Sequence, residues 1–139
     1  MLTQGAVMMF RLMFLPLAGL MLGMGVAHAE IRIGVIASST GPTAAVGIPQ
    51  KNTVALLPGE IGGQKIEYIV LDDASDPTSA VTNVRKLLAE HKVDALIGPT
   101  TTPAALAILD FVAEAKTPLV TTVGSSAVIQ PMDDKKKWV

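Results

Sequence analysis

From residue 30 onward, short runs rich in Ile, Val and Leu alternate with longer segments of helical pattern, and this alternation restricts the fold more than any other feature. Strands that alternate with helices build a mostly parallel sheet whose faces are covered by those helices. The runs predicted as strands lie at 31–36, 66–71, 93–97 and 118–120. The sequence therefore predicts an α/β fold with a doubly wound parallel sheet.

Two of the segments between strands carry a distinctive helix start. Asp76 is followed by Pro77, and Thr102 is followed by Pro103. An Asp or Thr oxygen at the N-cap accepts a backbone N–H of the first turn, where the missing N–H of proline costs nothing. We predict helices after both of these caps, a further helix at about 44–57, and a short helix that begins near Ser126.

The last five residues, 135–139, are interpreted as the approach to a fifth strand that is not completed. A sheet cut at an unpaired strand leaves backbone donors and acceptors open and one helix layer incomplete. We therefore expect residues 30–139 to form an incomplete domain.

The first 29 residues differ in composition from the rest. A single charge, Arg11, precedes the apolar block 12–22, and the segment closes on Ala27, His28 and Ala29. Small residues at these positions are typical of signal peptidase cleavage, which we expect before Glu30. An uncleaved membrane anchor is the weaker alternative, because the apolar run is shorter than the ~20 residues of a membrane span. We predict export of the remainder to the periplasm.

Composition excludes several classes of site. The chain has 11 Lys and Arg against 12 Asp and Glu, and no basic run longer than the three lysines at 135–137, so we expect no nucleic-acid partner. Cysteine is absent, which excludes a disulfide framework, a Cys-based metal or redox site and a lipid-modified cysteine. We expect neither a cofactor nor a metal.

Hydroxyl side chains follow three of the predicted strands, in the loops 38–41, 100–102 and 121–126. Ligands of doubly wound sheets bind outside the carboxyl ends of the strands, where these loops would meet. Hydroxyls and free N–H groups at helix starts can bind a carboxylate, aided by the helix dipole. The alternative is that Thr102 and Ser126 act only as N-caps.

Catalytic constellations are missing. His91 is the only histidine after residue 29, and it lies at the end of a predicted helix. Asp72 and Asp73 are neighbours at a strand end and point to opposite faces, while Asp76 serves as a cap. We therefore expect no enzyme. The alternative is a small exported hydrolase or phosphoacceptor-type α/β domain that uses Asp72, Asp73 and residues 100–102, supported by fold-level analogy alone.

Several motifs occur in a familiar order: Ile33-Gly34-Val35, Ser39-Thr40-Gly41-Pro42, Asp72-Asp73-Ala74-Ser75-Asp76-Pro77, and Ile97-Gly98-Pro99 with its threonine run. Over residues 31–139 the chain resembles the leucine/isoleucine/valine-binding proteins of the type I periplasmic binding fold. The resemblance implies part of the N-terminal lobe of a two-lobe, periplasmic solute-binding protein. Such a protein delivers a small-molecule ligand, an amino acid or small carboxylate, to an ABC permease in the inner membrane.

The resemblance also implies roles for particular residues. Thr101 and Thr102 would meet the ligand carboxylate, and the Ser125 hydroxyl and Val123 carbonyl would meet its ammonium group. Val46 falls where many relatives place a large side chain against the ligand. The second lobe of such proteins is not in this chain, so we expect residues 30–139 alone to bind ligand weakly, since one lobe leaves much of the ligand in water.

Overall fold

The computed structural model describes residues 30–139, in which β1 (Ile31–Ala37) lies at the centre of a five-stranded sheet. The strand order is β2-β3-β1-β4-β5. The other strands are β2 (Glu60–Ile61), β3 (Gln64–Asp72), β4 (Ala95–Ile97) and β5 (Leu119–Val120). β3, β1, β4 and β5 are parallel, and only the short β2 is antiparallel to its neighbour. The predicted α/β fold class is confirmed.

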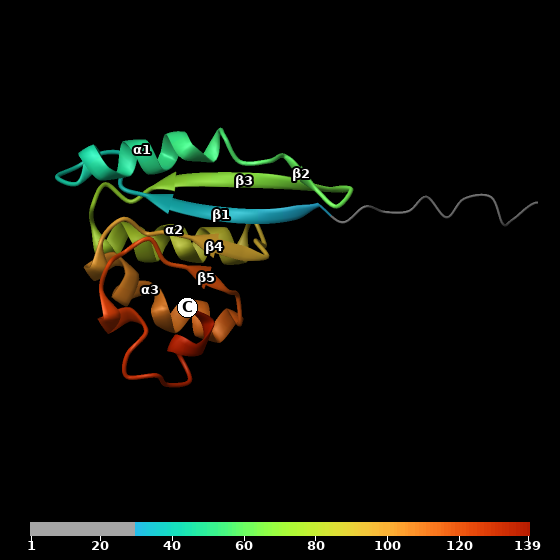
Figure 1. Cartoon of the computed structure of the whole chain (residues 1–139). Coiled ribbons are helices and arrows are strands. Elements are labelled where there is room, and N and C mark those ends of the chain that lie inside the picture. The colour runs from blue at the N-terminus through green and yellow to red at the C-terminus, as the bar shows by residue number, and fades with distance from the viewer. Residues whose placement is uncertain (1–29) are drawn as a thin grey trace, which may run out of the picture.

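Three α-helices cover the two faces of this sheet (Figure 1). α1 (Ala44–Val54) follows β1 and lies on one face, whereas α2 (Pro77–Ala89) and α3 (Thr102–Ala115) pack together on the other. The sheet is therefore doubly wound, as predicted. None of the helices within residues 30–139 is both long and apolar enough to cross a membrane.

Alternate residues of each strand face opposite layers, because the side-chain period of a strand is two. On the side of α2 and α3, Ile36, Leu96 and Leu119 are buried in the main core. The helices contribute buried side chains to that core at Ala80, Val84, Leu87, Ala104, Ile108 and Val112. Val35 and Ile97 point to the other side, toward α1.

The first helix and the segment after it differ from the prediction. α1 ends at Val54 rather than at residue 57, and the chain then enters a β2–β3 hairpin that the sequence analysis did not predict. Gly62 and Gly63 form its two-residue turn, with φ of 59° and 80°. Paired positive φ angles suit such hairpin turns, so this glycine pair connects two strands rather than simply ending a helix.

The predicted cap at Asp76 is confirmed, since its side chain accepts the Ser79 N–H at 2.8 Å. The other two caps lie one residue earlier than predicted. Thr101 accepts the Ala104 N–H, and Ser125 accepts the Ala127 N–H. Thr102 and Ser126 are already the first residues of their helices, so the prediction that they act as caps is wrong. Pro103 is the second residue of α3, where a missing N–H costs as little as it does at the first residue. The presence of Pro103 therefore does not show that the residue directly before it is the N-cap.

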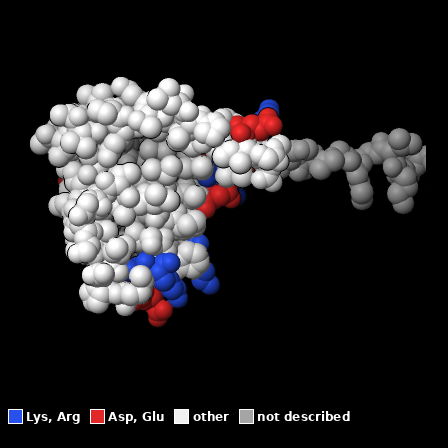
Figure 2. All heavy atoms as spheres, in the orientation of Figure 1, with Lys and Arg blue, Asp and Glu red and all other residues white. Residues whose placement is uncertain are grey.

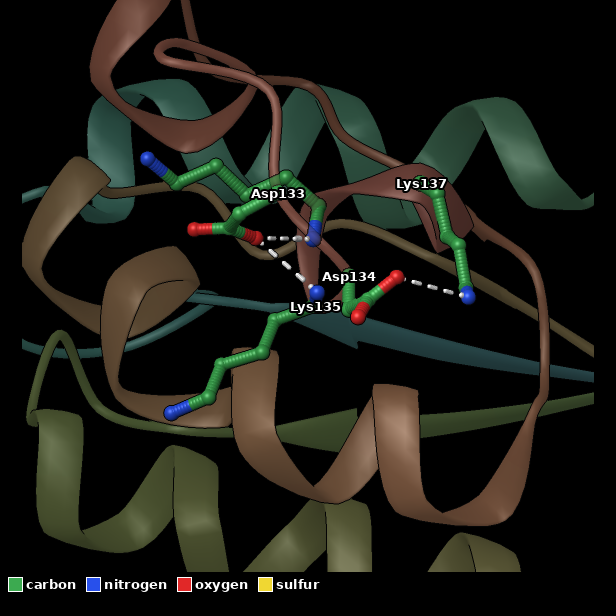
Figure 3. A network of polar contacts seen from close by, with 5 residues as sticks. Asp133, Asp134, Lys135 and Lys137 are labelled. Carbon is green, nitrogen blue, oxygen red and sulfur yellow. Dashed lines mark hydrogen bonds and ion pairs between the residues drawn. The ribbon is translucent and has the colours of Figure 1, made fainter.

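The prediction of a fifth strand at 135–139 is wrong. Lys136–Trp138 form a short 3-10 helix, η2, and Trp138 packs beside the core of α2 and α3. Figure 3 shows the cause: one carboxylate oxygen of Asp133 accepts the N–H groups of Lys135 and Lys136, which turns the chain. Aspartate favours such local turns over extended backbone.

Exposed ion pairs lie at this C-terminal turn. Lys135 Nζ lies 2.8 Å from an Asp110 carboxylate oxygen on α3. Lys137 Nζ lies 3.1 Å from an Asp134 carboxylate oxygen, and this second pair is drawn in Figure 3. The hydrogen bond to Asp110 raises the pKa of Lys135 above its ordinary value. Figure 2 shows charged side chains around this turn and also on the side of the β2–β3 hairpin, whereas the surface over α1 is uncharged in that view. The lysines therefore serve local pairing and solvation.

Candidate ligand-binding site

The loops after β1, β4 and β5 meet at one edge of the sheet. These three strands are parallel neighbours, so their carboxyl ends lie together, at the side toward which the arrow of β1 points in Figure 1. Ligands of doubly wound sheets bind outside this edge. The structure therefore brings together the three hydroxyl-rich loops that the sequence analysis selected.

Hydrogen bonds between loops hold this edge. The Ser38 N–H donates to Thr100 Oγ1 at 2.8 Å, and the Thr100 hydroxyl donates to Gln50 Oε1 of α1 at 2.6 Å. Thr122 Oγ1 donates to the Pro99 carbonyl at 2.8 Å. The loop after β4 is thus hydrogen-bonded to the end of β1 and to α1 on one side and to the loop after β5 on the other. The Thr100 hydroxyl donates its proton within the protein and does not offer it to a ligand.

Gly98 allows the close packing beneath this loop. Its φ is 109°, and an added Cβ would lie 2.1 Å from the Ile36 carbonyl oxygen of β1. No side chain fits there, and L-residues rarely adopt that φ. The Ile-Gly-Pro element of the sequence therefore has a steric cause at this site.

The start of α3 presents several hydrogen-bond donors. The backbone N–H groups of Thr100, Thr101 and Thr102 have no acceptor within residues 30–139, and neither does the Thr102 hydroxyl. Thr101 uses its oxygen, at 3.4 Å, to cap Ala104, which leaves its hydroxyl proton free to donate. Free donors at the positive end of a helix dipole are suited to a carboxylate.

The loop after β5 presents acceptors instead. Val123 and Ser125 line a shallow hollow of about 270 Å³, and the Val123 carbonyl receives no hydrogen bond from within residues 30–139. The Ser125 oxygen accepts the Ala127 N–H at 3.3 Å and retains a second lone pair. A carbonyl and a hydroxyl oxygen are suited to an ammonium group. Thr101 and Thr102 do not line this hollow.

Val46, the fifth predicted ligand residue, lies on α1 with 55% of its surface exposed. It is absent from the hollow lined by Val123 and Ser125. The structure therefore places the five predicted residues on three neighbouring elements of one edge without closing them into a single cavity.

The paired aspartates separate as predicted. Asp72 is exposed and accepts the Thr40 hydroxyl at 2.7 Å, whereas Asp73 is fully buried and accepts the Ser38 hydroxyl at 2.6 Å. Slight burial acts to raise the pKa of Asp72, but hydrogen bonds from Thr40 and Ala74 outweigh it, so the pKa lies below its ordinary value.

The buried position of Asp73 bears on the alternative of a hydrolase or phosphoacceptor, because a fully buried carboxylate presents no oxygen to a substrate. Within residues 30–139, no group of three or more His, Asp or Glu side chains could hold a metal ion. The structural role of Asp73 was missed from the sequence. Its signal was the strand-end position, where alternation turns one of two adjacent residues inward.

Comparison with known proteins identifies the family of the chain. The family model described as "Periplasmic binding protein" matches residues 30–137. The chain belongs to the periplasmic binding protein family. This family implies a periplasmic or extracellular location. The Leu/Ile/Val-binding protein BraC3 of Rhizobium johnstonii is 32% identical over an alignment of 130 positions, which covers 89% of this chain and 33% of that protein. The predicted resemblance to leucine/isoleucine/valine-binding proteins is confirmed.

Solved structures of this family are also similar. An extracellular ligand-binding receptor from Rhodopseudomonas palustris HaA2 superposes with a TM-score of 0.78 at 56% identity, over 80% of this chain and 31% of that one. An ABC transporter solute binding protein from Rhodopseudomonas palustris BisB5, in complex with 3,4-dihydroxy benzoic acid, superposes with a TM-score of 0.71 at 27% identity, over 78% and 30%. The chain therefore spans about a third of the length of these relatives.

Proposed function

We propose that this chain provides part of the N-terminal lobe of a solute-binding component of an ABC importer, and that it binds an amino acid or small carboxylate. The observation that carries the proposal is the set of free donors at the start of α3, next to free acceptors after β5. Carboxylate and ammonium groups, which an amino acid carries together, match these two sets.

The names of the relatives narrow the class of ligand. One relative is named for Leu, Ile and Val, and another was solved with 3,4-dihydroxy benzoic acid. Both kinds of ligand contain a carboxylate, whereas only the amino acids carry an ammonium group. In this proposal Thr101 and Thr102 hold the carboxylate of either ligand, and Val123 and Ser125 favour the amino acid. Val46 contacts the ligand side chain.

The partners and location follow from the same proposal. The ligand is passed to a permease in the inner membrane, and the chain performs no catalysis. A signal peptide at residues 1–29, which lie outside the described part of the chain, directs export to the periplasm. Residues 30–139 form an incomplete lobe that needs the remainder of a relative-length protein to enclose the ligand.

Isothermal calorimetry tests this proposal on two proteins: the chain itself, and the chain joined to the part of the Rhodopseudomonas palustris HaA2 relative that lies beyond the matched segment. Leucine, valine, phenylalanine and 3,4-dihydroxybenzoate are the ligands. We expect the joined protein to bind at least one of them, and the chain alone to bind at least about tenfold more weakly because half of the enclosure is missing.

The matched variants are Thr102→Val, which removes the hydroxyl at nearly constant volume, and Thr102→Ser, which keeps it. We expect the valine variant to weaken the binding of both ligand classes and the serine variant to retain it. Absence of heat with every ligand in the joined protein would contradict the proposed function.

A further inference from the structure

Asp73 is a buried acidic residue that the proposed contacts with the ligand do not use. Its relative exposure is 0%, and it lies at the carboxyl end of the sheet beside the candidate site. One carboxylate oxygen, Oδ1, accepts both the Ser38 hydroxyl at 2.6 Å and the Ser75 N–H at 3.0 Å. The other oxygen, Oδ2, has no hydrogen-bond partner within residues 30–139.

A carboxylate in this position is costly, because burial penalises the charge and one oxygen is left unpaired. An asparagine could accept the same two hydrogen bonds through its oxygen without carrying the charge. The 2.6 Å bond from Ser38 falls within the roughly 2.5–2.7 Å typical of charge-assisted O–H···O⁻ bonds, which are stronger than neutral ones.

The Ser38 residue connects this carboxylate to the candidate site. Its hydroxyl is held by Asp73, and its own N–H donates to Thr100 Oγ1 at 2.8 Å. The Thr100 hydroxyl in turn donates to Gln50 of α1. Thr100 directly precedes Thr101, so this hydrogen-bonded series from Asp73 to Gln50 fixes the point at which α3 begins.

We infer that Asp73 is a positioning residue for the ligand site: through Ser38 and Thr100 it holds the first turn of α3 where its free donors converge on the ligand carboxylate. This inference rests on the proposed function for the identity of the ligand. The loop geometry that it describes is independent of any ligand. Asp72 offers a matched comparison, because it also joins the loops after β1 and β3 but lies exposed and contacts Thr40 instead of Ser38.

Amide hydrogen exchange measured by NMR tests the inference on the full chain, residues 1–139, produced in a bacterial host. The variants are Asp73→Asn, Asp72→Asn, and the pair Thr100→Val and Thr100→Ser. We expect Asp73→Asn and Thr100→Val to lower the protection of the Ser38 amide by at least about tenfold, with core amides such as that of Leu96 unchanged. We expect Thr100→Ser, which keeps the hydroxyl, to retain the protection of the Ser38 amide. We expect Asp72→Asn to leave that protection unchanged.

Two results would overturn the inference. Unchanged protection of Ser38 in Asp73→Asn would show that the charge does not hold this residue. An equal loss of protection at Ser38 and Leu96 would show that Asp73 acts on global stability alone. Calorimetry on the same variants of the joined protein measures their affinity for leucine, which we expect Asp73→Asn to weaken about tenfold. If the unmutated joined protein binds nothing, the proposed function fails, while the exchange result still decides the positioning role.

Discussion

The two faces of the sheet are covered differently. On one face, α2 and α3 bury a continuous set of apolar side chains from themselves and from the strands. On the other face lies α1 alone, whose only buried residue is Gly47. Adjacent residues of β5 show the contrast: Leu119 faces α2 and α3 and is 3% exposed, whereas Val120 faces the other way and is 64% exposed.

The two faces of the sheet also differ in how closely side chains pack against them. A partly open apolar cavity of about 250 Å³ lies between α1 and the sheet, lined by residues that include Val35, Val54 and Ile97. The α2/α3 face contains the closely packed core. Parallel sheets are normally covered on both faces, and this chain spans about a third of its relatives. We therefore expect the α1 face to gain cover in a protein of the relatives' length.

α1 adds little to the hydrophobic core, but it places Gln50 at the candidate site. An added Cβ at Gly47 would lie 2.0 Å from the Ser38 carbonyl oxygen, so the helix passes close to the end of β1. That approach allows Gln50 to reach Thr100 at the candidate site. The comparison indicates that the α2/α3 face supplies stability, while the α1 face supplies the geometry of the ligand edge.

The largest expected effect comes from a matched pair on β5. Leu119→Ala should destabilise the fold by about 2–5 kcal/mol, because it leaves a cavity in the packed face. Val120→Ala should change stability by less than about 0.5 kcal/mol, because that side chain is already in water. Urea denaturation monitored by circular dichroism measures both. Equal losses in the two variants would remove the proposed contrast between the faces.

The next effect concerns the close approach of α1. Gly47→Ala should destabilise the fold by about 1–3 kcal/mol through overpacking against the Ser38 carbonyl, despite the higher helix propensity of alanine. Gly59→Ala is the control, since an added Cβ there meets nothing within 4 Å. The same denaturation measurement applies. A neutral Gly47→Ala would mean that α1 can shift without cost.

Val120→Lys tests whether the α1 face of the sheet, which is exposed at Val120 in this chain, becomes covered in the joined protein. In the chain alone, we expect a change in stability below about 0.5 kcal/mol and less self-association, because an exposed apolar side chain is replaced by a charge. In the joined protein, burial of that lysine should cost at least about 1 kcal/mol. Thermal unfolding and analytical ultracentrifugation measure the two quantities. A neutral effect in the joined protein would show that the face stays open.

The smallest expected effect is a dependence on pH. Hydrogen bonds from the Ser79 N–H and hydroxyl lower the pKa of Asp76, the cap of α2, and those from Thr40 and Ala74 lower the pKa of Asp72. A lowered folded-state pKa contributes stability above the unfolded value of about 3.9, which is lost as pH falls through the folded value. We expect Asp76→Asn to flatten the loss of stability below about pH 4. An unchanged slope in acid denaturation would argue against this cap contribution.

Several features could be predicted from local sequence because local physics decides them. The order of the parallel strands and α-helices followed from the alternation of apolar runs, and the Asp76 cap followed from the chemistry of one side chain next to Pro77. The three hydroxyl loops could also be assigned to one edge, because parallel strands place their carboxyl ends together. The wrong predictions, at residues 135–139 and at two caps, arose where competing local preferences differ by little free energy.

By itself, the sequence determined the α/β class, the succession of its parallel strands and α-helices, and the family to which the chain is similar. Only the tertiary structure decided which polar groups remain free to meet a ligand. Thr100, Thr101 and Thr102 look alike in the sequence, yet Ser38 and Gln50 occupy the Thr100 hydroxyl, while the Thr102 hydroxyl has no partner within residues 30–139. Periodicity acts along one segment, whereas the satisfaction of a hydrogen bond depends on loops brought together from distant parts of the chain.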